Sequence, residues 1–373
     1  MNVRSRSSRG QWVASVSSKP ALFALVCLAA SVSPACGGGE ASPPVPPVPT
    51  AAPTPPTPPV AATTAAPVAT APSVSEPPKA NPPTNPAVVW KDMATPESVL
   101  YDADGDRYLV SNINGGPLDA DNNGFISELS PDGTVKKLKF IEGGKKATLN
   151  APKGSVIVKG VFYVADIDHV RMFDAKTGAP KGAIKVPEAT FLNDMAASPD
   201  GRIFVSDSGL RQDGEGFAPT GSDAVYEIVK GKPVAIVKSK SLEGPNGLLF
   251  AEGRLLVNTF NAAHLFSIAD HYLNPPKKQK VGPGVVEAVQ MPPAMENVTK
   301  LPNGGLDGLV YTGTSYVVSS WGGKAVYRGA LGGVFATVLD SIAAAADMGY
   351  DTKRKRLLVP RFMGNVVEAY DIQ

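Results

Sequence analysis

The feature that most constrains the fold is a repeat of short strand-like segments, each of which begins with a polar residue. After residue 88 the chain consists of apolar runs such as RYLVSNI, RIFVSDSG and RLLVNTF, which Asp/Gly turns separate. Extended helical periodicity is missing from this part of the sequence. Short apolar strands between regularly spaced turns are typical of all-β domains. The pattern therefore predicts an all-β fold.

The repeats open on six short motifs whose spacing matches propeller blades. The motifs start at Pro96 (PESV), Pro152 (PKGS), Leu192 (LNDM), Pro245 (PNGL), Leu306 (LDGL) and Ala346 (ADMG). Successive motifs lie 40 to 61 residues apart, which suits four-stranded blades with loop insertions. The segment 88–90 precedes the first repeat and is predicted to close the ring as the outer strand of the last blade. The sequence thus predicts a six-bladed β-propeller over residues 88–373.

Each motif has a polar residue at its second position, although the rest of these strands is Val, Leu, Met and Ala. The innermost strands of a propeller line the central channel and start near one mouth, so equivalent positions converge there. In chain order these positions are Glu97, Lys153, Asn193, Asn246, Asp307 and Asp347. We therefore expect a ring of polar side chains, three of them carboxylates, at one mouth of the channel.

Four members of this ring have the chemistry of a divalent cation site. Two are carboxylates and two are amides: Glu97, Asp307, Asn193 and Asn246. Ca²⁺ accepts about six to eight hard oxygen ligands of this kind. The structural alternative is that Asn and Asp at strand starts satisfy neighbouring backbone groups. Carboxylates that face each other across a channel repel unless a cation lies between them, and this favours the metal site.

The order of the motifs PESV, LNDM, GPNGL and GLDGL resembles the gluconolactonase family, which is also called the SMP-30 or regucalcin family. The same order of motifs is more distantly similar to that of paraoxonases and strictosidine synthases. The resemblance covers essentially the whole region from Glu97 onward. It implies one catalytic divalent metal held by Glu97, Asn246 and Asp307, with Asn193 as a further ligand or a substrate contact. The metal it implies is Ca²⁺, with Zn²⁺ and Mn²⁺ as alternatives.

The resemblance also implies metal-assisted hydrolysis of a small-molecule lactone or related ester. The metal would polarise the carbonyl, and Asp307 or Asp347 would take the proton of the attacking water. Asn193 is expected to contact the substrate, and Asp194 resembles the aspartate beside the second calcium of paraoxonases.

Lys153 is not part of the family's metal set. We expect it to form an ion pair with Asp347 or Glu97, because a cation in the channel reduces carboxylate repulsion; the alternative is that it binds an anionic group of the substrate. The segments Trp321-Gly322-Gly323 and Arg361-Phe362-Met363-Gly364 follow inner strands and are expected to shape the mouth of the channel.

Two other functions remain open on the sequence alone. A propeller also serves as a non-catalytic platform that binds a ligand or a protein partner at the channel mouth, so the fold does not choose between them. A condensation catalyst like strictosidine synthase would use a channel carboxylate without a metal, and nothing in the sequence points to its amine substrate.

Residues 1–36 are predicted to be an export signal. Four basic residues precede an apolar run from Ala21 to Ala30 that is too short to span a bilayer. The stretch SVSPACGGG resembles the lipobox of bacterial lipoproteins, in which the cysteine, here Cys36, is lipidated. This implies a protein of the periplasm or cell surface, anchored to the outer membrane, whose membrane contact is the lipid alone.

Residues 37–87 are rich in Pro, Ala and Thr and are predicted to be a disordered linker. Cleavage before Cys36 would remove four of the 36 basic residues and none of the 34 acidic ones, which changes the net charge from +2 to −2. A nearly neutral chain without a dense basic cluster argues against nucleic acid as a partner. Both cysteines precede residue 37, so no disulfide is expected in the propeller.

Overall fold

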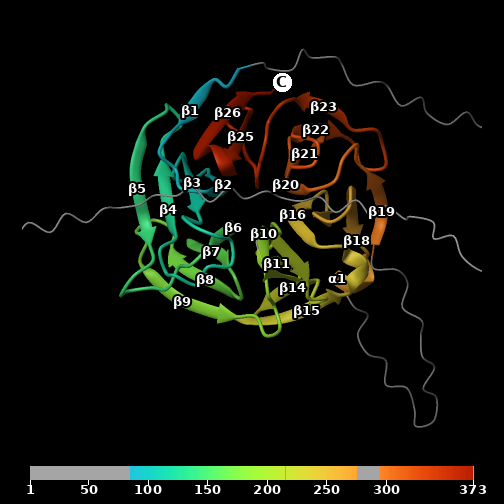
Figure 1. The fold of residues 1–373 in the computed structure, drawn as a ribbon, viewed down its shortest axis with the longest axis horizontal. Helices are drawn as coiled ribbons and strands as arrows, with labels where there is room; N and C mark the ends of the chain where they lie inside the picture. Colours follow the sequence, from blue (N-terminus) through green and yellow to red (C-terminus); the bar gives the residue numbers. More distant parts are fainter. Residues whose placement is uncertain (1–84, 215, 275–294, 373) are drawn as a thin grey trace, which may run out of the picture. The chain divides into compact units, whose positions relative to one another are not determined.

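The computed structural model describes residues 85–214, 216–274 and 295–372. The predicted export signal, Cys36 and nearly all of the predicted linker lie outside these ranges. The described residues form six four-stranded antiparallel sheets arranged as blades around a central axis (Figure 1). This confirms the all-β, six-bladed propeller. Among the described residues, helix is confined to η1 (Lys240–Leu242), α1 (Asp270–Leu273) and η2 (Phe362–Gly364). None of these is long enough to cross a membrane.

In the first three blades the strands follow chain order from the axis outward. Their bounds are β2 (Pro96–Asp102), β3 (Arg107–Asn112), β4 (Phe125–Leu129) and β5 (Val135–Glu142) in blade 1; β6 (Pro152–Val158), β7 (Val161–Asp166), β8 (His169–Asp174) and β9 (Pro180–Lys185) in blade 2; β10 (Leu192–Ala197), β11 (Ile203–Asp207), β14 (Ala224–Val229) and β15 (Lys232–Lys238) in blade 3. A separate hairpin, β12 (Leu210–Asp213) with β13 (Gly216–Pro219), is inserted between β11 and β14.

The remaining blades repeat this order, and the last one is completed from the other end of the chain. Their strands are β16 (Pro245–Ala251), β17 (Arg254–Thr259), β18 (His264–Ile268) and β19 (Met295–Lys300) in blade 4; β20 (Leu306–Tyr311), β21 (Tyr316–Ser320), β22 (Ala325–Gly329) and β23 (Ala336–Leu339) in blade 5; β24 (Gly349–Asp351), β25 (Arg356–Arg361), β26 (Val366–Asp371) and β1 (Val88–Trp90) in blade 6. The pairing of β1 with β26 confirms that the segment 88–90 closes the ring.

The hydrophobic core lies between the blades. Six clusters of buried apolar side chains occupy the six interfaces between neighbouring blades. In β17, Leu255 and Val257 belong to the cluster shared with blade 3, whereas Leu256 belongs to the cluster shared with blade 5. Because successive residues of a strand point to opposite faces, both faces are buried and the strand is apolar throughout.

The inner strands are bulged where the motifs begin. In each of the first five blades the register between the first and second strands shifts just after the first residue of the motif, for example between Pro245 and Leu248. A β-bulge bends its strand and redirects the side chain at the irregularity. The polar second residue of each motif lies in this bulged segment.

Candidate functional site

The five polar residues Glu97, Lys153, Asn193, Asn246 and Asp307 occupy equivalent positions at the starts of their inner strands. All five are buried, with exposed fractions between 1% and 7%. Hydrogen bonds link neighbouring strands at this level. The Asn246 Nδ2 atom donates to the carbonyl of Leu306, and the Asp347 amide donates to the carbonyl of Glu97. The predicted convergence at one end of the channel is therefore present in the first five blades.

The sixth blade departs from the prediction by one residue. Ala345 pairs with Arg361 in an isolated bridge, and Gly349 pairs with Leu358. This register places Ala346 at the position of the other polar residues and Asp347 one residue further along the strand. Asp347 is thus equivalent to Ser98 and Asp194, not to Glu97 and Asp307. The sequence does not reveal this shift, because no residue next to Ala346 or Asp347 marks where the strand is bulged.

Three of the predicted metal ligands each have an oxygen atom without a hydrogen-bond partner. Within the described residues, five buried side-chain polar atoms lack a partner, and three of them are Glu97 Oε2, Asn246 Oδ1 and Asp307 Oδ1. A buried oxygen that accepts no hydrogen bond is costly. Three such atoms, on the inner strands of blades 1, 4 and 5, fit a bound cation, which would satisfy all of them together.

The other atoms of these side chains are fixed by hydrogen bonds. The indole Nε1 of Trp321 donates to Asp307 Oδ2 at 2.8 Å, so Oδ1 is the free oxygen of that carboxylate. Asn193 donates through Nδ2 to the hydroxyl of Ser208 at 3.1 Å, which leaves its carbonyl oxygen available to a cation. No group of three or more His, Cys, Asp and Glu side chains in the described ranges is arranged to hold a metal. The candidate set instead combines two carboxylates with amide oxygens.

The carboxyl groups of the ring carry more negative charge than the neighbouring groups neutralise. Burial raises the pKa of Glu97 well above its usual value, and the neighbouring charges of Asp307 and Asp347 raise it further. Burial and the charge of Asp347 likewise raise the pKa of Asp307. Both shifts arise because a carboxylate without water or a counterion is unstable. A divalent cation at this position would oppose both effects.

Lys153 does not form the predicted ion pair. Its Nζ donates to the carbonyls of Pro117 at 2.9 Å and Ala151 at 3.1 Å, and it lies 4.6 Å from the centroid of the Phe191 ring. The ion pairs of the described residues do not include Lys153, so the prediction of a direct pair with Asp347 or Glu97 is wrong. Burial lowers the pKa of Lys153 to about 8, while the charge of Glu97 opposes this shift. The ammonium is thus held by carbonyl oxygens and the aromatic ring.

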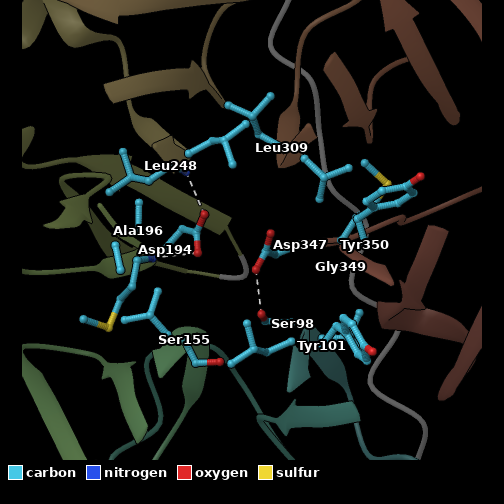
Figure 2. A pocket seen from close by; sticks show the side chains of 18 of the residues that line it. Ser98, Tyr101, Ser155, Asp194, Ala196, Leu248, Leu309, Asp347, Gly349 and Tyr350 are labelled. Atoms are coloured by element: carbon cyan, nitrogen blue, oxygen red, sulfur yellow. Dashed lines mark hydrogen bonds between the residues drawn. The ribbon is translucent and has the colours of Figure 1, made fainter. Parts of the chain in front are cut away.

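Asp194 and Asp347 lie one residue further along the inner strands and line a cavity of the channel. Figure 2 shows the two carboxyl groups pointing toward each other into a cavity of about 250 Å³. The Ser98 hydroxyl donates to Asp347 Oδ2 at 2.6 Å, and the backbone N–H of Leu248 donates to Asp194 Oδ2 at 2.7 Å (Figure 2). Burial raises the pKa of Asp347 to about 7. Most of the other residues that line this cavity are apolar, among them Leu309.

Glycine occupies the level of Asp194 and Asp347 in three other blades. A Cβ atom on Gly154 would lie 2.0 Å from Asp194 Oδ1, and one on Gly308 would lie 2.2 Å from the backbone nitrogen of Met348. The Cβ of a residue replacing Gly247 would meet a similarly close backbone oxygen. Adjacent inner strands therefore lie too close together at this level to admit a further side chain.

Two hydrogen bonds that hold side chains of the site in place could not be predicted from the motifs. Ser208 orients Asn193, and Ser98 holds Asp347. Ser98 is the third residue of the first motif, but a serine at a strand start is common and has no distinctive spacing. Trp321 was expected only to shape the channel mouth, and its bond to Asp307 depends on the pairing of β20 with β21.

Comparison with solved structures identifies the architecture. A gluconolactonase from Xanthomonas campestris superimposes with a TM-score of 0.53 at 18% identity, over 75% of this chain and 86% of that one. The chain has the gluconolactonase propeller fold. A putative gluconolactonase gives a TM-score of 0.52 at 16% identity, over 77% of this chain and 94% of that one. A streptogramin B lyase gives a TM-score of 0.50 at 9% identity, over 76% of this chain and 96% of that one. No protein-family model and no curated protein sequence matches the chain.

Proposed function

We propose that the protein is a divalent-metal-dependent hydrolase of a lactone or related ester, with Ca²⁺ as the preferred ion. The observation that carries the proposal is the set of unpartnered buried oxygens on Glu97, Asn246 and Asp307. Hard oxygen donors of this kind suit Ca²⁺, and the similarity to gluconolactonase propellers supports the reaction class. Asn193 supplies a fourth oxygen.

In the proposed reaction, water adds across the ester bond. The acyl C–O bond breaks, the acyl carbon gains a hydroxyl group, and the ring oxygen receives a proton, so a lactone becomes a hydroxy acid. A divalent cation, when bound, supplies the positive charge that polarises the ester carbonyl. The ring residues hold this cation and orient the substrate beside it.

Two carboxylates are available to accept the proton of the attacking water. Asp307 borders the site directly, but a carboxylate that also holds a cation is a weaker base. Asp347 has a pKa of about 7, which suits a general base near neutral pH, although it lies one residue deeper. The variants Asp307→Asn and Asp347→Asn separate these roles, because only the former should also abolish metal binding.

Lys153, Asn193 and Asp194 are proposed to position the substrate. Lys153 has two of its three N–H groups directed at carbonyl oxygens, so one remains for an anionic group such as the carboxylate of the product. We further propose that the protein is exported and anchored by lipid at Cys36, with the stretch 37–87 as a spacer. In that arrangement the lipid is its only membrane contact, and its partners are small molecules and not nucleic acid.

The test is calorimetric titration of the full chain, freed of metal by a chelator, with Ca²⁺, Mn²⁺ and Zn²⁺. The proposal requires stoichiometric binding that Asp307→Asn removes and that Asp104→Asn, on an exposed turn, leaves intact. Hydrolysis of a panel of lactones should follow the same pattern. If none of the three ions binds, the metal site is absent, and the non-catalytic propeller with a ligand or protein partner becomes the better account.

A further inference from the structure

The mouth at which the predicted ligands lie is surrounded by a second set of equivalent residues. In each of the first five blades, the last residue of the second strand pairs with the first residue of the motif, as Thr259 pairs with Pro245 and Ser320 with Leu306. In the sixth blade, the last residue of the second strand, Arg361, pairs with Ala345. Antiparallel pairing therefore places the residue that follows the second strand at this mouth. The six residues at this position, which we call the collar, are Ile113, Ile167, Ser208, Phe260, Trp321 and Phe362.

Three neighbouring blades contribute aromatic residues that form one continuous group. The ring centroids of Phe260 and Trp321 lie 6.2 Å apart at an interplanar angle of 70°, and those of Trp321 and Phe362 lie 5.2 Å apart at 59°. All three side chains are only partly buried. This half of the collar therefore presents a continuous apolar surface at the mouth.

The aromatic group is joined directly to the candidate metal site. Trp321 is at its centre and donates its indole N–H to Asp307 Oδ2 at 2.8 Å. A molecule whose reacting carbonyl lies at Asp307 thus has the aromatic surface beside it.

The collar offers few hydrogen bonds to a polar molecule. Ser208 is its one residue with a hydroxyl group, and this hydroxyl already accepts from Asn193 and donates to the carbonyl of Pro245 at 2.8 Å. The indole N–H of Trp321 is taken by Asp307. Sugar hydroxyls that lose water against such a surface would remain without partners, which is unfavourable. An aromatic ring placed there would gain both apolar burial and edge-to-face contacts.

We propose that the substrate is a lactone fused to, or carrying, an aromatic ring, and that the aromatic half of the collar binds this ring. The proposal rests on the hydrolase function proposed above and names its substrate class. Phe260 and Phe362 determine specificity, whereas Trp321 both contacts the substrate and positions Asp307. A polyhydroxylated sugar lactone is then a poor substrate for this chain.

The first test compares kcat/KM of the full chain for dihydrocoumarin and for glucono-δ-lactone. Phe260→Ala and Phe362→Ala should each lower kcat/KM for dihydrocoumarin about tenfold, since one lost apolar contact has this size of effect, and change the value for gluconolactone less than about twofold. Phe140→Ala, on the outer strand β5, is the matched control and should change neither. Faster turnover of gluconolactone, or equal losses for both substrates in the collar variants, would overturn the proposal.

A binding measurement separates this proposal from the hydrolase function. The lactam 3,4-dihydro-2-quinolinone has the shape of dihydrocoumarin and resists hydrolysis, and its binding beside Trp321 should quench tryptophan fluorescence in a saturable way. The dissociation constant should rise about tenfold in Phe362→Ala and stay constant in Phe140→Ala. Quenching of this kind without hydrolysis of any lactone would support the collar and reject the hydrolase. Hydrolysis that does not depend on Phe260 or Phe362, together with no quenching, would support the hydrolase function and reject ligand binding by the collar.

Discussion

Trp321 binds one oxygen of Asp307 and leaves the other free. Its indole Nε1 lies 2.8 Å from Oδ2, while Oδ1 is buried without a partner. Asp307 lies in β20 and Trp321 directly follows β21, and the register of these two strands includes the pairing of Leu306 with Ser320. The contact therefore fixes which oxygen of Asp307 faces a cation held in the ring.

We expect Trp321→Phe to weaken Ca²⁺ binding without abolishing it. The phenyl ring retains the apolar contacts but cannot donate a hydrogen bond, so Asp307 is no longer held in one orientation. Loss of a hydrogen bond to a metal ligand typically costs about tenfold or more in affinity. Titration calorimetry measures the effect. Trp90→Phe, in the outermost strand β1 of blade 6, serves as the control. Unchanged affinity in Trp321→Phe would mean that Asp307 is oriented by other contacts.

Replacing Lys153 should strengthen metal binding while it weakens the fold. In Lys153→Met the buried positive charge that acts on Glu97 is removed, so repulsion of a divalent cation decreases and its affinity should rise about tenfold. The carbonyls of Pro117 and Ala151 lose their donor, which should lower the free energy of unfolding by about 1–3 kcal/mol. Calorimetry and chemical denaturation measure the two effects separately. Weaker cation binding in this variant would contradict the electrostatic argument.

The metal-free protein should lose stability as the pH rises. Burial raises the pKa of Asp347 to about 7, above the value of about 4 expected in the unfolded chain. A carboxyl group with a raised pKa favours the folded state fully below its unfolded pKa, and this contribution disappears as the pH passes the folded pKa. In the presence of a chelator, the melting temperature should therefore fall between about pH 4 and pH 7, and less steeply in Asp347→Asn. Equal slopes in both proteins would show that Asp347 is not buried in this way.

The inner strands should not accept a side chain in place of Gly308. In Gly308→Ala the new Cβ would lie 2.2 Å from the backbone nitrogen of Met348, so adjacent inner strands must separate. We expect a loss of about 3 kcal/mol in unfolding free energy, near the upper end for overpacked cores. Gly216→Ala is the control, because the nearest atom to its Cβ is 3.8 Å away. Chemical denaturation of both variants tests the prediction, and similar stabilities would contradict it.

Much of the fold follows from local sequence patterns. Alternating apolar strands, Asp/Gly turns and six motifs at blade spacing predict the propeller because each blade is built from nearby residues. The closing strand is also predictable, since an unpaired outer edge in the last blade needs a partner and Val88–Trp90 is the apolar segment before the first repeat. The equivalence of Glu97 with Asn246 and Asp307 follows from the same repetition.

Several contacts of the site are beyond what the motifs determine. The one-residue shift of Asp347 and the bond from Trp321 to Asp307 depend on the strand register within a blade, and the contact of Lys153 with the carbonyl of Pro117 joins two blades. A bulge changes which side chain faces the axis without changing composition. The sequence by itself determined the blades, their number and the polar character of one mouth. Only the tertiary structure decided which polar atoms stay unpartnered there, because that depends on distances between strands from different blades.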